Sequence, residues 1–176
     1  MNQWKRALLS LFIMCSALIF DGVIAFYGGS ILNTPTGIMV PRLTILALVI
    51  LTNHLQTPMI YYLAILFGFI YDSYYVGFFG IYTVGFFGVA YVLTQLWRSV
   101  YSSYIIYILA SLLAVLLIEV FAFAIYHILD ITQWTIQEFF VFRLGATLVF
   151  NGGMMAAFGW MIDKAMKKVK DRNTTY

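Results

Sequence analysis

The amino-acid sequence predicts an all-α, polytopic membrane protein with about six transmembrane helices. Hydrophobic residues make up 63% of its 176 residues and charged residues only 10%, whereas soluble domains average about 45–50% and about 25%. A soluble fold could not bury this much apolar surface, so we expect lipid to cover it. The length fits one integral-membrane domain over residues 1–176. Aromatic residues, at 19%, are typical of chains with rings at membrane interfaces.

Six apolar stretches predict the membrane spans, each of which needs roughly 20 residues of helix. They cover residues 7–26, 41–57, 58–76, 77–97, 104–128 and 139–162. The first is longer than the apolar core of a cleavable signal peptide, so we expect a retained helix. Two connections, around His54–Pro58 and Ser73–Gly77, are very short. A five-span arrangement, with the second or third helix re-entrant, is therefore the alternative.

The basic residues predict the orientation, because Lys and Arg accumulate on the cytoplasmic side of a membrane. With both termini in the cytoplasm, Arg42 and Arg143 fall toward the outside. The cytoplasmic set is then Lys5, Arg6, Arg98, Lys164, Lys167, Lys168, Lys170 and Arg172. This bias favours an even number of spans. The basic tail, 163–176, is predicted to continue the last helix and to lie on anionic lipid headgroups, with a cytoplasmic partner as the alternative.

Five charged residues lie within or at the edges of the predicted spans, all in the outer half of the membrane. They are Asp21, Arg42, Asp72, Glu119 and Arg143. A charge at membrane depth costs about 2.5–3.5 kcal/mol on insertion scales unless it is paired or hydrated. Matching depth and opposite sign predict that Arg143 pairs with Glu119, and that Arg42 pairs with Asp21 or Asp72. Such pairs either hold helices in register, or line an outward-facing cavity or a partner's helix.

Small residues form two stripes at helical spacing. Gly77, Gly80, Gly85 and Gly88 are predicted to share one side of the fourth span, and Gly145, Gly152, Ala156 and Gly159 one side of the sixth. Small residues let another helix approach closely. The stripes are therefore candidates for internal helix packing, for a homodimer contact, or for a contact with a partner's membrane helix.

The motifs of several enzyme classes are missing from the sequence. It contains no GxxxxGK[ST] phosphate loop, no HExxH or GxSxG, and no GxGD. Neither histidine nor the single cysteine, Cys15, stands at metal-ligand spacing. Most of the positive charge sits at the two chain ends and one loop, which is not a nucleic-acid signal. We therefore expect no enzyme activity, no cofactor, no metal and no nucleic-acid partner.

Three residues around the third and fourth spans resemble a family motif. Gly68, then Asp72, then Gly80 before an apolar helix resemble the MreD family, the integral-membrane subunits of the bacterial rod-shape machinery, or elongasome. Val89-Ala90-Tyr91 looks like the small-residue and tyrosine ending of that helix. Short length, six spans and cytoplasmic termini are also similar to the family.

The resemblance implies a multi-pass protein of the bacterial cell membrane that serves cell shape and peptidoglycan synthesis as a non-catalytic scaffold or regulator. It implies MreC as partner, bound through its membrane helix, with the elongation synthases and the cytoskeletal protein reached indirectly. The alternative is the substrate-binding S-component of an energy-coupling-factor vitamin transporter, whose six-helix bundle the MreD family resembles. The first span lacks the Ala-x-x-x-Ala docking motif that such subunits usually carry.

Overall fold

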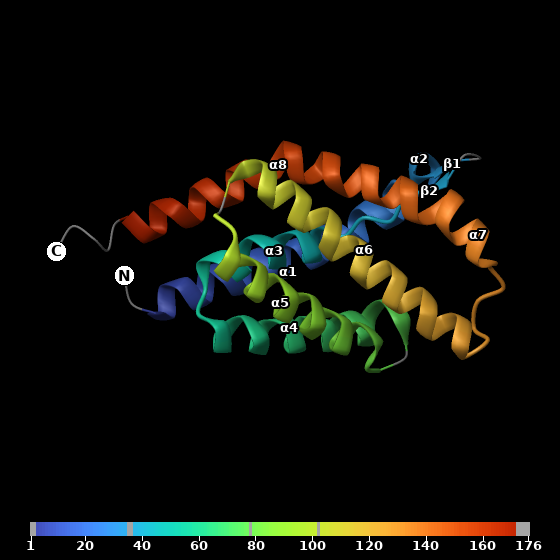
Figure 1. The fold of residues 1–176 in the computed structure, drawn as a ribbon, viewed down its shortest axis with the longest axis horizontal. Helices are drawn as coiled ribbons and strands as arrows, with labels where there is room; N and C mark the ends of the chain where they lie inside the picture. The colour runs from blue at the N-terminus through green and yellow to red at the C-terminus, as the bar shows by residue number, and fades with distance from the viewer. Residues whose placement is uncertain (1–2, 35–36, 78, 102, 172–176) are drawn as a thin grey trace.

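Helices form nearly all of the computed structural model, which describes residues 3–34, 37–77, 79–101 and 103–171. The elements in order are α1 (Gln3–Tyr27), α2 (Gly29–Leu32), β1 (Asn33–Thr34), β2 (Gly37–Ile38), α3 (Leu43–His54), α4 (Thr57–Tyr71), the π-helix η1 (Asp72–Val76), α5 (Ile81–Ser99), α6 (Tyr104–Ile128), α7 (Ile136–Glu138), the π-helix η2 (Phe139–Leu144) and α8 (Gly145–Asp171). The start of α1 and the end of α8 lie at one end of the bundle, and α7 and the strands lie at the other (Figure 1). We call the second end the α7 end.

Three helical stretches are long and apolar enough to cross a membrane, namely Arg6–Tyr27, Tyr104–Ile128 and Ile136–Met161. The predicted all-α membrane class is therefore confirmed, while the number of crossings stays a prediction. The predicted span 41–57 corresponds to α3, which has only 12 residues. Its length of about 18 Å at 1.5 Å per residue is well short of the roughly 30 Å hydrocarbon core.

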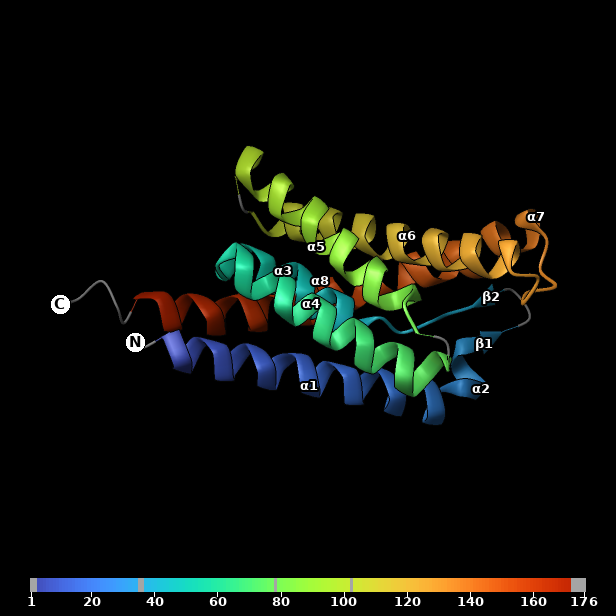
Figure 2. The ribbon, with the colours of Figure 1, turned by 90° about the horizontal axis from the view of Figure 1, so that it is seen from below.

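Helix α3 is short but central. Helices α1, α5, α6 and α8 all pack against it, and every residue from Thr44 to Thr52 is buried. Figure 2 shows α1 along one side of the bundle and α5 with α6 along the other, with α3 and α4 between them. An apolar helix without a polar face is typical of a buried core helix, so α3 is enclosed by protein rather than by lipid.

The predicted fourth span begins later than the sequence suggested. Residues 77–97 were expected to be helical, but α5 starts at Ile81. Gly77 and Gly80 have positive φ angles of 74° and 109°, a left-handed backbone that glycine adopts without strain. They end η1 and begin α5, so they do not share a helical face with Gly85 and Gly88. The predicted four-glycine stripe is wrong for this reason.

A short antiparallel strand pair lies at the α7 end of the bundle. Asn33 pairs with Ile38, and Thr34 with Gly37. A Cβ atom at Gly37 would lie only 2.9 Å from the carbonyl oxygen of Phe142. The hairpin backbone therefore rests directly on η2, and the extended segment that follows it leads into α3.

Candidate functional site

Arg42, the residue before α3, is the centre of a buried polar network. Its side chain is 3% exposed. Nε donates to Oε1 of Glu119 at 2.6 Å, and Nη2 lies 2.5 Å from the same oxygen. Nη1 donates to the Tyr71 hydroxyl at 2.6 Å, and Nη2 to the Tyr82 hydroxyl at 2.8 Å. Every side-chain nitrogen of Arg42 thus has a partner, and the partners come from α4, α5 and α6.

Glu119 of α6 also forms an ion pair with a second arginine, Arg143. The Arg143 Nε donates to its Oε2 at 3.1 Å, and the Glu119 side chain is only 1% exposed. This is the Arg143–Glu119 pair predicted from the sequence, and it joins α6 to η2. Each carboxylate oxygen therefore faces one guanidinium group. A buried charge is tolerated when its partners satisfy it in this way.

The predicted pairing of Arg42 with Asp21 or Asp72 is wrong, because Glu119 is the partner of Arg42. Asp21 instead caps the start of α3. Its Oδ1 accepts the N–H of Leu43 at 2.5 Å, and its Oδ2 accepts the N–H of Thr44 at 3.0 Å and the Thr44 hydroxyl at 2.7 Å. The first N–H groups of a helix lack partners within the helix, and a carboxylate satisfies both their hydrogen bonds and the helix dipole.

Asp72 has the same role at the start of α5. Its Oδ2 accepts the N–H groups of Gly80 and Thr83 at 2.9 Å each, and its Oδ1 accepts that of Tyr82 at 2.7 Å. At Gly68, a Cβ atom would lie 2.6 Å from the Thr83 Cα, so the backbones of α4 and α5 touch there. The Gly68, Asp72 and Gly80 motif therefore shapes the hairpin formed by α4, η1 and α5.

Two polar residues of α8 that the sequence reasoning missed complete the network. Asn151 Oδ1 accepts the backbone N–H of Arg42 at 2.8 Å, and Asn151 Nδ2 donates to the carbonyl of Val40 at 2.8 Å. The Thr147 hydroxyl accepts the N–H of Val40 at 3.2 Å. Both residues are fully buried. Two polar side chains four residues apart in an apolar helix were the signal that could have found them.

Two of the predicted small residues pack inside the bundle. A Cβ atom at Gly85 would overlap the Ile118 side chain of α6, and one at Gly152 would lie 3.0 Å from the Leu112 side chain of the same helix. Of the three alternatives for these two residues, internal packing is the one present. Both glycines allow α6 to approach its neighbours closely.

The other small residues are placed differently. A Cβ atom at Gly88 would meet open space, and one at Gly145 would come no nearer than 3.8 Å to a neighbouring atom. At Gly159 the Cβ position lies 2.7 Å from the Met155 sulfur of its own helix. The Ala156 carbonyl accepts a hydrogen bond from the Tyr104 hydroxyl. Among the small residues of the two predicted stripes that lie within helices, Gly88 and Gly145 are thus the two that have no close neighbour and remain open to a partner.

The backbone of the basic tail is helical to Asp171, but nearly all of its side chains lie outside the described part of the chain. The side chains of 165–176 are among those not described, so the predicted lipid contact of 163–176 stays a prediction. Lys164 Nζ lies 4.7 Å from the centre of the Trp160 ring. Within the described part of the chain, no three His, Cys, Asp or Glu side chains gather as a metal site requires.

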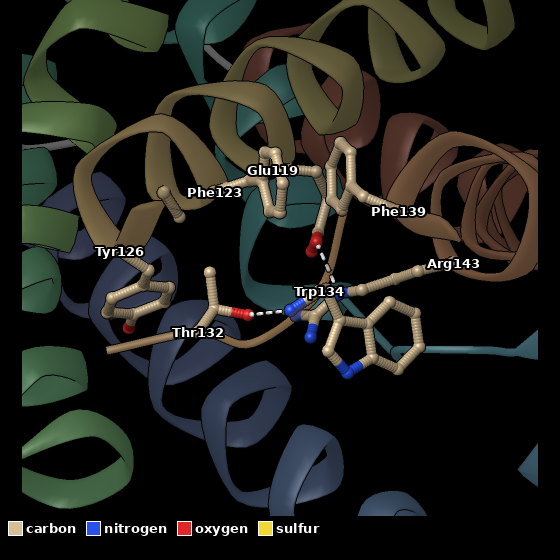
Figure 3. Close-up of a pocket in the computed structure, with 8 residues that line it drawn as sticks. Glu119, Phe123, Tyr126, Thr132, Trp134, Phe139 and Arg143 are labelled. Carbon is tan, nitrogen blue, oxygen red and sulfur yellow. Dashed lines mark hydrogen bonds and ion pairs between the residues drawn. The ribbon is translucent and has the colours of Figure 1, made fainter. Parts of the chain in front are cut away.

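A small cavity opens beside Arg143 at the α7 end of the bundle (Figure 3). It measures about 60 Å³. It is lined by Glu119, Ala122, Phe123, Tyr126, Thr132, Trp134, Phe139 and Arg143. Figure 3 shows the Arg143 side chain reaching between Glu119 and Trp134. The cavity therefore combines one charged donor with aromatic walls.

A second, larger hollow is a groove of about 630 Å³ between α1, α3 and α8. Its lining runs from Ile13 to Ile24 on α1 and from Met154 to Met161 on α8. Among the described residues of the lining, Ser16 alone is polar, and its hydroxyl donates to carbonyls of its own helix at 2.9 Å. The groove is thus an apolar surface without a polar anchor of its own.

Comparison with known proteins identifies relatives across most of the chain. The family model described as rod shape-determining protein MreD matches residues 5–169. The chain is also 26% identical over 118 residues to the rod shape-determining protein MreD of Bacillus subtilis (strain 168), an alignment that covers 67% of this chain and 69% of that protein. No solved structure matches the chain.

Proposed function

Because this chain belongs to the MreD family, a family of rod shape-determining membrane proteins, we propose that it is a non-catalytic scaffold or regulator of peptidoglycan synthesis that binds MreC. The family match over residues 5–169 supports the cell-shape role. The scaffold role is supported by the polar side chains, because Asp21 and Asp72 cap helices and Glu119 joins Arg42 to Arg143. These groups hold the bundle together.

The apolar groove between α1, α3 and α8 is the observation that carries the MreC proposal. Its α1 lining, Ile13–Ile24, is about 16 Å long at 1.5 Å per residue, or three helical turns. Ala17, Ala47 and Gly159 lie in its wall, and small residues let a second membrane helix approach closely. One membrane helix of MreC, laid along the groove, would cover this surface. The elongation synthases and the cytoskeletal protein are reached through MreC in this proposal.

We further propose that the single domain spans the bacterial cell membrane six times with both termini in the cytoplasm. The start of α1 and the end of α8 lie at the same end of the bundle (Figure 1), as an even number of crossings requires. Helices α3 and α4 together with η1 then make two crossings, with α3 shielded by its neighbours. The basic tail of α8 would meet anionic headgroups on the cytoplasmic face.

The alternative function, the vitamin-binding subunit of a transporter, fits the cavity at the α7 end less well. That cavity measures about 60 Å³, whereas small-molecule sites are roughly 300–1,000 Å³. Arg42 and its two tyrosine partners fill the neighbouring interior. A vitamin-sized ligand would have to displace this network.

Affinity purification of the tagged chain from its native membrane, with the partners identified by mass spectrometry, tests the proposal. We expect MreC to co-purify with the wild type and with Ala124→Trp, a control on the exposed face of α6. Ala17→Trp should lower MreC recovery about tenfold, because the indole fills the groove.

Each other outcome has a definite meaning. Equal MreC recovery by both variants would reject the groove as the docking site. Capture of a transmembrane coupling protein with two ATPases would replace the scaffold with the transporter subunit. Capture of a second copy of this chain, lost in Ala17→Trp, would assign the groove to a homodimer.

A further inference from the structure

Arg143 is the arginine of the Glu119 cluster whose hydrogen-bond donors are not all used. Two guanidinium groups, those of Arg42 and Arg143, face one carboxylate. Asp21 and Asp72 accept the N–H groups at the starts of α3 and α5 and do not accept a hydrogen bond from Arg143. An anionic group that accepts hydrogen bonds from a partly exposed guanidinium is strongly bound, because both partners are charged. We propose that the cavity beside Arg143 binds the phosphate group of a phospholipid from the leaflet at the α7 end.

The donors that face the cavity are those that an anionic oxygen needs. Arg143 uses Nε for Glu119, and its side chain makes no other hydrogen bond or ion pair among the described residues. Its two terminal nitrogens are therefore available to a ligand. Thr132 Oγ1 accepts the N–H of Trp134 at 3.2 Å, which leaves its hydroxyl proton to donate. A guanidinium fork matches the spacing of two phosphate oxygens, and the paired hydrogen bonds are strong because both groups are charged.

The size of the cavity restricts the ligand to a small polar group. Its volume of about 60 Å³ exceeds the roughly 10–15 Å³ that a cavity needs, by the same measure, to hold one water molecule. A phosphate group fits this volume, whereas a drug-sized molecule requires several hundred Å³. The Arg143 side chain is 34% exposed, against 1% for Glu119. The cavity is thus reached from outside on the Arg143 side.

The surroundings of the cavity mouth favour a lipid over a free anion. Apolar side chains of the neighbouring segments are exposed there, with Ile136, Phe140 and Val141 57%, 50% and 66% exposed. Trp134 lies at the edge of the cavity (Figure 3), and tryptophan is enriched at the level of lipid headgroups. A phospholipid satisfies both features at once, since its phosphate meets Arg143 while its acyl chains lie against the exposed apolar surface.

Native mass spectrometry of the purified chain in detergent, titrated with dioleoyl phosphatidylglycerol, tests this site. We expect one lipid to bind the wild type with higher affinity than any further lipid. Arg143→Gln should weaken that binding at least tenfold. Arg98→Gln is the matched control, since Arg98 is exposed, donates only to Gln95 among the described residues, and lies in the last turn of α5. This control should bind as the wild type does.

A second variant keeps the proposal testable if Arg143→Gln does not fold. Ala122 lines the cavity and is 3% exposed. Ala122→Leu should block the phosphate while leaving the Arg143–Glu119 pair intact, and we again expect at least tenfold weaker binding. Circular dichroism verifies that each variant remains helical.

Three results would overturn the proposal. Unchanged lipid affinity in both Arg143→Gln and Ala122→Leu would show that the phosphate does not bind here. Competition by free glycerol phosphate at the same concentration as the lipid would assign the cavity to soluble anions. Unchanged lipid affinity with reduced MreC recovery in Arg143→Gln would assign it to an acidic side chain of the partner.

Discussion

The α4–α5 hairpin and the pair of helices α1 and α8 are built in opposite ways. In the hairpin, the backbones touch at Gly68, and the buried Asp72 satisfies three N–H groups at the start of α5. Helices α1 and α8 instead face each other across a groove of about 630 Å³. In the hairpin, polar and small residues hold α4 and α5 together. Between α1 and α8, an apolar surface stays open, and in our proposal another molecule binds there. Substitutions in the two regions should therefore change different properties.

The largest loss of stability is expected at Glu119, where the hairpin meets the rest of the bundle. Glu119→Gln leaves the buried Arg42 without its counter-charge, and removing one partner of a buried ion pair costs about 3–5 kcal/mol. Thermal unfolding in detergent measures this loss. Adding Arg143→Met should restore none of it, because Arg42 still lacks its counter-charge. A double variant as stable as the wild type would contradict the central place of Arg42.

Asp72→Ala should be the next most destabilising change. It leaves the N–H groups of Gly80, Tyr82 and Thr83 without their acceptor, and an unsatisfied buried group costs about 1–3 kcal/mol. We expect a loss of about 3 kcal/mol in the free energy of unfolding, measured as above. Asp72→Asn keeps one carbonyl oxygen and should lose less. Equal stability of Asp72→Ala and the wild type would remove the capping role.

Gly68→Ala should cost about 1–3 kcal/mol, the range typical of overpacking. Its added Cβ atom would lie 2.6 Å from the Thr83 Cα and 2.8 Å from the Tyr82 carbonyl oxygen. Gly88→Ala is the matched control in the same hairpin, because its Cβ atom meets open space. The control should be neutral or slightly stabilising, since alanine is the better helix former. If both variants have the same stability, the close contact between the α4 and α5 backbones does not require glycine at position 68.

The smallest effect on stability is expected in the groove. Ala17 is half-buried beside the groove, and the added ring enters the groove rather than the core, so we expect a loss of about 1 kcal/mol in the free energy of unfolding, the average for single substitutions. Recovery of MreC should nevertheless fall about tenfold, as described above. A large loss of stability without a change in MreC recovery would show that the groove is closed in the membrane, and the contrast between the two regions would disappear.

Composition and hydropathy were sufficient to predict the all-α membrane class, because a chain that is 63% hydrophobic must be covered by lipid. The motif around Asp72 was sufficient to indicate the MreD family, which the match over residues 5–169 confirms. Depth along the helices also predicted the Arg143–Glu119 pair. The fold class, the family motif and this ion pair all depend on which residue types occur at which positions along the chain, and the sequence contains that information.

The tertiary structure decided which residues at similar depth meet. Arg42, Asp21 and Asp72 have similar predicted depths, yet Arg42 turns toward Glu119 while both aspartates accept backbone N–H groups at helix starts. Gly85 faces α6 and Gly88 faces open space, although they are three residues apart. The rotation of each helix about its axis is set by packing against its neighbours, and residue spacing alone does not contain it. The groove and the cavity beside Arg143 follow from that packing.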